Sequence, residues 1–166
     1  EGFLESTQAS AVIMDERDID VPVAVIRNPN PYLAFQRAMK ILYGDLYLPP
    51  KGIHPTAVLG RNVKLGADVS IGPYVVVESG TRIGDRAIIR AGTYVGADTV
   101  IGADTQIYPN VVIRERVRIG SECIIHAGAI IGDDGFGIAK DGVENHKIPQ
   151  IGTVVIGNAV EIGSNT

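Results

Sequence analysis

The sequence has few aromatic residues and almost no cysteine. Phenylalanine and tyrosine together make up 5% of the 166 residues, and tryptophan is absent. A core with so few large rings must be thin and filled by valine, isoleucine and leucine. The single cysteine, Cys123, excludes an internal disulfide framework and fits a reducing compartment. The length allows one ordinary domain, or one domain with a small partner.

Other absences exclude whole classes of function. The net charge is −4 with acids and bases interleaved, so no basic block indicates nucleic-acid binding. No apolar run approaches the ~20 residues of a membrane span. The first ten residues have neither a basic start nor an apolar stretch, so no signal peptide is predicted.

What the sequence does contain is a period of six residues. From Leu59 to Ile131, every sixth residue is leucine, isoleucine or valine, and the residue two positions earlier is small or β-branched. Eight of the thirteen residues that follow them are glycine. These thirteen aliphatic residues, called the rungs below, are Leu59, Leu65, Ile71, Val77, Ile83, Ile89, Val95, Ile101, Ile107, Ile113, Ile119, Ile125 and Ile131.

A period of six fits neither an α-helix nor a hairpin sheet, whose side chains repeat about every 3.6 and 2 residues. It fits a left-handed parallel β-helix, in which three flat sides close a coil of about eighteen residues. The rungs then fill the prism, and the turn glycines tolerate positive φ. A β-sandwich would need varied strand spacing and hairpin turns such as Asn-Gly, which the repeats lack. The predicted fold is therefore mainly all-β.

The first part of the chain does not follow the six-residue period. Residues 9–14 and 21–26 are β-branched apolar runs typical of short strands, and residues 31–43 form an amphipathic helical pattern with Pro31 at its start. We predict the remnant of a small α/β domain over 1–48, a stiff linker over 49–53, and the β-helix over 54–166. Because the chain lacks an initiator methionine and stops within a repeat, we expect a segment cut from a longer protein at both ends.

The six-residue period breaks at Asp133. Residues 133–150 lack it, and Ile151, Ile156 and Ile162 resume it in a shifted phase. An irregular excursion from a regular solenoid forms a loop at one corner, and such loops carry function. We therefore predict an inserted loop over 133–150 as the functional segment.

Three functions are compatible with such a solenoid. A zinc hydratase of the γ-carbonic anhydrase type needs three histidine ligands. This chain has only His54, His126 and His146, and the period puts His54 four coils below His126, so no metal site is predicted. A non-catalytic scaffold would be a bare repeat without an excursion.

The third function is acyl transfer, in which a histidine serves as general base and backbone N–H groups hold the oxyanion. His126 is the histidine inside the regular repeats, at a position usually held by glycine, so its side chain points outward. It is a weak candidate for the base, and a polar surface or interface role is the preferred interpretation. Cys123 occupies an inward position, typical of a core thiol.

Four pieces of the sequence carry a family resemblance. They are Ala-Ser-Ala-Val-Ile at 9–13 with Asn-Pro-Tyr-Leu-Ala at 30–34, His-Pro-Thr-Ala-Val at 54–58, Gly-Asp-Asp-Gly-Phe-Gly at 132–137 followed by Lys-Ile-Pro-Gln-Ile-Gly at 147–152, and Val-Ile-Gly-Asn-Ala-Val-Glu-Ile-Gly at 155–163. In these pieces the chain resembles the UDP-3-O-(3-hydroxyacyl)glucosamine N-acyltransferases of Gram-negative lipid A and lipopolysaccharide biosynthesis. The third piece is the most specific.

The resemblance implies transfer of a 3-hydroxyacyl chain from acyl carrier protein to the 2-amine of a UDP-3-O-acylglucosamine. It implies a homotrimer with sites between subunits, and a donor carried on the phosphopantetheine of the carrier protein, without a metal or redox cofactor. It also implies a cytoplasmic location that allows peripheral contact with the inner membrane.

The resemblance also shows where this chain departs from the family. The family's catalytic histidine lies in an Ile-Ala-His-Asn-type repeat, which we expect beyond residue 166, and His126 does not match it. Its uracil-binding residues are expected before residue 1, so 1–48 is expected to be part of a uridine-binding domain, and the piece is expected to be inactive alone. The residues carried over as substrate contacts are Asp134, Gly135, Phe136, Gly137, His146, Lys147 and Gln150.

Two alternatives stay open at this point. A sibling enzyme, the UDP-N-acetylglucosamine O-acyltransferase, begins directly with its repeats, so residues 1–53 speak against it. Phe136 is equally well explained as a hydrophobic anchor of its own loop.

Overall fold

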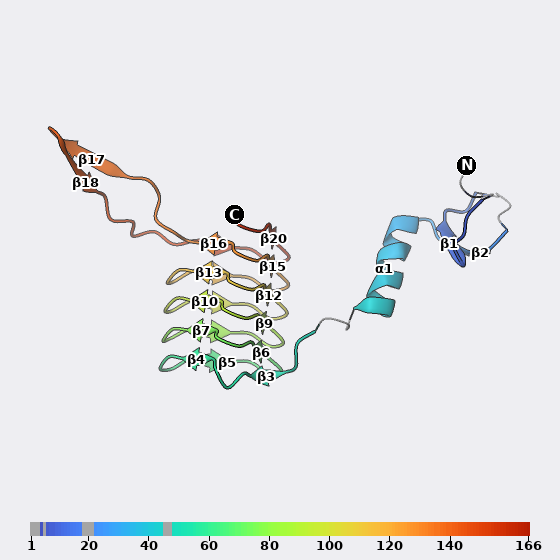
Figure 1. Ribbon diagram of the computed structural model, residues 1–166, viewed down its shortest axis with the longest axis horizontal. Coiled ribbons are helices and arrows are strands. Elements are labelled where there is room, and N and C mark those ends of the chain that lie inside the picture. The colour runs from blue at the N-terminus through green and yellow to red at the C-terminus, as the bar shows by residue number, and fades with distance from the viewer. Residues whose placement is uncertain (1–3, 5, 18–21, 45–47) are drawn as a thin grey trace. The chain divides into compact units, whose positions relative to one another are not determined.

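The computed structural model describes residue 4 and residues 6–17, 22–44 and 48–166 (Figure 1). Contacts divide the chain into two compact units, Glu1–Leu48 and Pro49–Thr166. Helix α1, the one helix in the described part, is 13 residues long, and none there has the length and apolar character needed to cross a bilayer.

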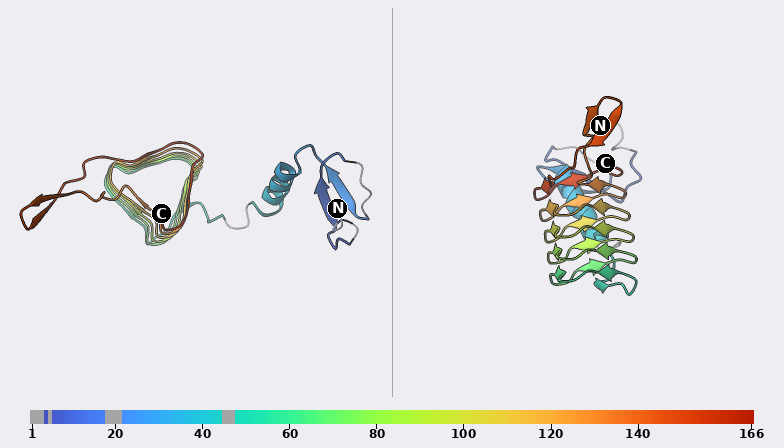
Figure 2. Two further views of the ribbon diagram at one scale, coloured as in Figure 1. Left: turned by 90° about the horizontal axis from the view of Figure 1, so that it is seen from above. Right: turned by 90° about the vertical axis from the view of Figure 1, so that its left-hand side faces the viewer.

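The second unit is a stack of triangular coils (Figure 2). Its two-residue strands form three sheets, each named here by its first strand, and every pairing between coils is parallel. The β3 sheet comprises β3 (Gly52–Ile53), β6 (Ser70–Ile71), β9 (Ile88–Ile89), β12 (Gln106–Ile107), β15 (Ile124–Ile125) and β20 (Glu161–Ile162). The β4 sheet comprises β4 (Val58–Leu59), β7 (Val76–Val77), β10 (Tyr94–Val95), β13 (Val112–Ile113) and β16 (Ile130–Ile131). The β5 sheet comprises β5 (Lys64–Leu65), β8 (Arg82–Ile83), β11 (Val100–Ile101), β14 (Arg118–Ile119) and β19 (Val155–Ile156).

The rungs form the core of this prism. Eleven of the thirteen are buried, and Leu59 and Leu65, in the first coil, pack against the same cluster. The inward threonines beside them are also buried, and each hydroxyl donates to a main-chain carbonyl; the Thr105 hydroxyl, for example, lies 2.8 Å from the carbonyl oxygen of Gly120. Satisfied hydroxyls make threonine compatible with this core. The predicted left-handed parallel β-helix is confirmed.

The turn glycines have a different role from the one the sequence suggested. Seven of the eight glycines that follow a rung do not have positive φ, so the turn does not use their tolerance of left-handed backbone. The left-handed residue comes two positions later, as at Asn62 and Asp98. A Cβ on Gly102 would lie 2.5 Å from the main-chain carbon of Gly120 in the next coil. Glycine follows the rung because the next coil passes too close for a side chain.

Replacing Gly102 with alanine tests this explanation. Gly102→Ala should destabilise the chain by about 1–3 kcal/mol, the usual range for overpacking, because backbone atoms must move. Gly157→Ala is the matched control, since that glycine follows the core-facing Ile156 in the last coil and a Cβ there meets nothing within 4 Å. Urea unfolding followed by circular dichroism measures both. Equal losses in the two variants would contradict the explanation.

The solenoid begins two residues earlier than predicted. Gly52–Ile53 was assigned to the linker over 49–53, but it pairs with Ser70–Ile71 as strand β3. Ile53 lies six residues before Leu59 and so extends the rung period by one step. Ile53 lies at the first end of the stack and is 49% exposed.

The return to regular coils also differs from the prediction. Ile156 and Ile162 face the core, with Val154 and Val160 packed beside them. Ile151 is 83% exposed and belongs to no strand, so its assignment to the resumed period was wrong. Its five-residue spacing from Ile156 does not match the six-residue repeat, and it lies in the chain returning from the insertion.

The first unit contains two parallel strands, β1 (Ala11–Met14) and β2 (Ala24–Arg27), and helix α1 (Pro31–Tyr43). The predicted helix over 31–43 is confirmed, and its N-cap is Asn30, whose side chain accepts from the main-chain N–H of Leu33 at 3.1 Å. The predicted strands were placed slightly early, and Val21 of the second lies outside the described residues.

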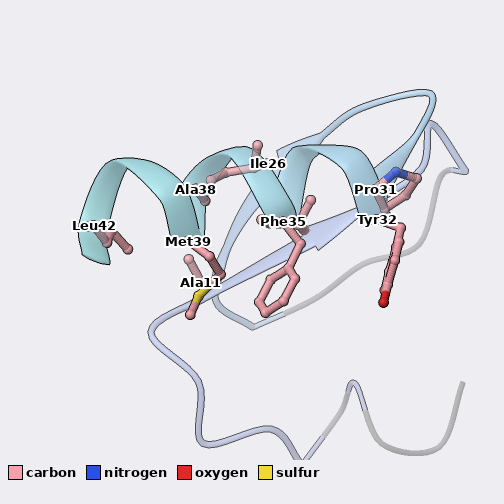
Figure 3. A pocket seen from close by; sticks show the side chains of 9 residues that line it. Ala11, Ile26, Pro31, Tyr32, Phe35, Ala38, Met39 and Leu42 are labelled. Atoms are coloured by element: carbon pink, nitrogen blue, oxygen red, sulfur yellow. The ribbon is translucent and has the colours of Figure 1, made fainter. Parts of the chain in front are cut away.

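An open apolar groove of about 480 Å³ runs between α1 and the two strands (Figure 3). Phe35 and Met39 of α1 line it opposite Ala11, and Tyr32 at its end is 85% exposed. The assignment of this unit to uridine binding stays a prediction.

Candidate functional site

The predicted loop over 133–150 projects from the corner after β16 as an arm (Figures 1 and 2). The arm, defined as residues 133–153, contains an antiparallel hairpin of β17 (Ile138–Asp141) and β18 (Glu144–Lys147). Asp141 pairs with Glu144, which leaves a two-residue turn that starts at Gly142 with φ of 57°. Sequence analysis missed this hairpin, although glycine at the first turn position of a two-residue loop is a recognised hairpin signal.

Ionic and hydrogen bonds fix the root of the arm to the coil below. Arg114, which follows β13, approaches a carboxylate oxygen of Asp133 at 2.8 Å and also binds Glu115. These two carboxylates raise the pKa of the Arg114 guanidinium, Glu115 more strongly than Asp133. On the returning side, the hydroxyl of Thr153 donates to the carbonyl of Arg116 at 2.8 Å. The arm therefore leaves the prism in a defined direction.

A second ion pair joins the two chains of the arm. The ammonium of Lys147 lies 2.5 Å from a carboxylate oxygen of Asp134, and its hydrogen bond holds the pKa of that carboxyl below its usual range. The N–H of Ile148 donates to the carbonyl of Gly137 at 2.9 Å just beyond. Together these contacts close a hollow of about 340 Å³ on the arm, lined by Asp134, Gly135, Phe136, Gly137, Ile138, Asn145 and Lys147.

The hollow brings together five of the seven predicted substrate contacts: Asp134, Gly135, Phe136, Gly137 and Lys147. Gln150 lies beside them, because Cβ atoms on Gly135 and Gly137 would come within 3.2 Å of its amide oxygen and nitrogen. Sequence analysis missed Asn145 and Ile138, which only the strand pairing places at the hollow.

His146, the seventh, is not among the residues that line the hollow. Side chains alternate along a strand, so Asn145 and Lys147 share one face of β18 and His146 points to the other. There its Nε2 lies 3.6 Å from a carboxylate oxygen of Glu144. The substrate contacts of all seven residues stay predictions.

His126, the weak candidate for the base, lies at a different corner, between β15 and β16. Its Nε2 is 2.6 Å from a carboxylate oxygen of Glu161. Its ring lies 5.1 Å from that of Tyr108, and the guanidinium of Arg90 lies 4.9 Å over the tyrosine on the other side. These side chains form one column along the corner, away from the arm's root. A catalytic role for His126 stays a prediction.

The Asp134–Lys147 pair gives the arm a pH dependence. A carboxyl whose pKa is lowered in the folded state stabilises that state above its ordinary pKa of 3.8, and this contribution is lost as the pH falls below that value. Hydrogen exchange of the β17 and β18 amides should therefore speed up, relative to the coils, as the pH falls from 5 to about 3.

Asp134→Asn tests the assignment, because it removes the titrating group and should make exchange in the arm fast at pH 5 already. Asp141→Asn, at the hairpin turn, is the control and should preserve the pH dependence. An unchanged profile in Asp134→Asn would refute the role of the pair.

Comparison with known proteins agrees with the predicted repeats. The family model described as bacterial transferase hexapeptide (six repeats) matches residues 62–97 and 98–133. A UDP-3-O-acylglucosamine N-acyltransferase 1 from Legionella pneumophila (strain Paris) is 48% identical over 162 residues, which are 98% of this chain and 46% of that protein. The chain belongs to the UDP-3-O-acylglucosamine N-acyltransferase family. The resemblance drawn from the sequence is thereby confirmed.

Other members of the UDP-3-O-acylglucosamine N-acyltransferase family show the same pattern. The protein of that name from Coxiella burnetii (strain Dugway 5J108-111) is 42% identical over 201 residues, covering 98% of this chain and 48% of that protein. The one from Leptothrix cholodnii is 49% identical over 144 residues, covering 86% and 42%. The chain thus spans just under half the length of these relatives.

Among solved structures, WeeI from Acinetobacter baumannii AYE superposes with a TM-score of 0.52 at 18% identity, covering 92% of this chain and 75% of that one. At this identity the likeness shows a shared fold.

Proposed function

We propose that the chain is part of an N-acyltransferase that moves a 3-hydroxyacyl group from acyl carrier protein to the 2-amine of UDP-3-O-acylglucosamine in lipid A biosynthesis. The observation that carries the proposal is identity of 48% with an enzyme of that name over 98% of the chain, arm included. The hollow on the arm, where five predicted contacts meet, supports the same assignment.

The reaction needs an uncharged acceptor amine and a donor thioester that is held in position. The amine nitrogen attacks the thioester carbonyl, a C–N bond forms, the C–S bond breaks, and the proton lost by the amine ends on the departing thiol. A general base takes that proton and a backbone N–H stabilises the oxyanion. Oxidation states do not change, so the proposal includes no redox cofactor. The donor arrives on the phosphopantetheine of the carrier protein.

In this proposal the arm binds and orients the acceptor. Lys147 supplies a cation for an anionic nucleotide sugar, and Phe136 offers a ring that is 96% exposed on the arm itself. The amide of Gln150 provides a donor and an acceptor at the root. Asp134 positions Lys147 through their ion pair.

The proposal also covers assembly and location. Hexapeptide β-helix acyltransferases are typically trimeric, and we propose a homotrimer that meets acyl carrier protein and a lipid-bearing UDP-sugar. We place it in the cytoplasm, with peripheral contact to the inner membrane.

A chimera tests the function directly. The chain replaces the matching 162 residues of the Legionella relative, and transfer of a labelled 3-hydroxyacyl group to UDP-3-O-acylglucosamine is measured. We expect turnover that requires both the carrier-bound donor and the acceptor amine. A folded chimera without turnover, beside an active parent enzyme, would contradict the proposal.

The same assay tests the arm. Lys147→Ala should lower kcat/KM by about tenfold or more, the effect of losing one charged contact. Lys140→Ala, on the other strand of the same hairpin and not among the residues lining the hollow, is the matched control and should be near neutral. Equal losses of kcat/KM in the two variants would show that the arm is not part of the binding site.

A further inference from the structure

A cavity of about 410 Å³, called the foot pocket below, opens at the end of the stack where the solenoid begins. Its walls come from the chain just before β3, from β3 and β6, and from the corners that follow these two strands. The large apolar side chains that line it are Pro49, Pro50, Ile53, Pro55, Ile71 and Pro73. Strand β3 is the first of the solenoid and the arm follows β16 at the other end of the stack, so the foot pocket is remote from the arm.

The walls of the foot pocket are held rigidly. Four of the lining residues are prolines, whose rings fix the φ angle. The main-chain N–H of Gly52 donates to the carbonyl of Val69 at 2.7 Å, and that of His54 donates to the carbonyl of Ile71 at 2.8 Å. A cavity that is fixed before binding loses little conformational freedom when a ligand enters. Its volume is in the lower part of the range for small-molecule sites.

Ser70 places a hydroxyl group in these apolar walls. It comes directly before the rung Ile71 and therefore points outward from β6, yet it is only 4% exposed. It lines the foot pocket, and in the described part of the chain its hydroxyl makes no hydrogen bond. The buried threonines of the prism differ, because each of their hydroxyls donates to a main-chain carbonyl. A buried hydroxyl without a partner is unfavourable, so Ser70 favours a ligand that brings a polar atom into the cavity.

Two hydrogen-bond donors lie at the exposed rim of the foot pocket. The main-chain N–H of Thr56 donates to Nδ1 of His54 at 3.3 Å, so the proton of the neutral imidazole is on Nε2. Among the described residues, none accepts a hydrogen bond from that Nε2. The ammonium of Lys51 lies 2.9 Å from a carboxylate oxygen of Asp68 and has further N–H groups to donate. Donors of this kind suit the oxygen atoms of a carboxylate.

The composition of the walls argues against a nucleotide as the ligand. Among the described residues, no aromatic side chain lines the foot pocket, so a base would have no ring on which to stack. Lys51 is the one lysine or arginine that lines it, and Asp68 already balances its charge, which leaves little attraction for a pyrophosphate. Aliphatic walls with one inner hydroxyl and donors at the rim favour a hydrocarbon chain that carries oxygen atoms near one end.

We propose that the foot pocket binds a medium-chain fatty acid with a hydroxyl group near its carboxylate. The hydrocarbon chain packs against the prolines and isoleucines, the hydroxyl pairs with Ser70, and the carboxylate meets His54 and Lys51 at the rim. The 3-position of the hydroxyl is taken from the acyl group of the proposed function, and the inference rests on that function in this respect. Because the arm lies at the other end of the prism, this ligand is a second molecule and not the acceptor held at the arm.

Calorimetric titration of the chain with 3-hydroxydecanoate and with decanoate, both below their micelle concentrations, tests the site. We expect 3-hydroxydecanoate to bind about fivefold more tightly, the effect of one hydrogen bond. Ser70→Ala should bind the two acids equally, with an unchanged circular dichroism spectrum. Ser121→Ala is the matched control, since that serine lies at another corner and does not line the foot pocket, and it should keep the difference.

Three results of the titration would overturn the proposal. They are the absence of binding, equal affinities of the parent chain for the two acids, and a difference that survives in Ser70→Ala or is lost in Ser121→Ala. Neither acid is a donor or an acceptor of the transfer reaction, so a negative result leaves the proposed function standing. An inactive chimera beside normal binding would refute the function and keep the site.

Amide chemical shifts locate the ligand independently. Titration of the isotope-labelled chain with 3-hydroxydecanoate should move the signals of residues 51–55 and 70–73. The apolar groove between α1 and the first two strands is the competing site for a hydrocarbon chain. Shifts that spare residues 51–55 and 70–73, whether they fall on that groove or on the arm, would show that the foot pocket is not the binding site.

Discussion

Parallel pairing between successive coils is the constraint on which the structure depends. Below the arm, each two-residue strand pairs with a strand eighteen residues further along, as Val58 does with Val76, and β14 and β15 pair across the arm with β19 and β20. Every coil must therefore close its triangle in register. The rungs make this possible by stacking one aliphatic side chain on another at each side. Short strands of this kind gain little individually, and the stack is stable because each coil buries its neighbour's interior.

This constraint also explains how the arm can exist. The chain leaves the solenoid after Ile131 and resumes pairing at Val155. The coil beneath is already complete, and the returning strand β19 pairs with its strand β14. Polar contacts at the root join the arm to that same coil, through Arg114 with Asp133 and through the Thr153 hydroxyl with the carbonyl of Arg116. A rigid scaffold thus holds an irregular segment whose side chains are free to serve binding.

The sequence predicted the features that depend on the local six-residue period. It predicted few of the features that depend on how closely neighbouring coils approach one another. Period six identified the rungs, and the amphipathic pattern with Pro31 at its start identified α1. The reason for glycine after a rung could not be inferred, because the close approach at Gly102 involves a residue eighteen positions away. The motif of the arm predicted five residues of one hollow, whereas Asn145 required the hairpin register. The orientation of His146, away from the hollow that Asn145 and Lys147 line, also depends on the hairpin register.

The central claim is that the arm on the β-helix contacts the acceptor substrate. Photocrosslinking tests it most directly, with UDP-3-O-acylglucosamine carrying a diazirine on its sugar and the chimeric enzyme as target. Mass spectrometry of the digest should find label on peptides from residues 133–150. Label that spares these residues and falls on the outer face of the β3 sheet would contradict the account.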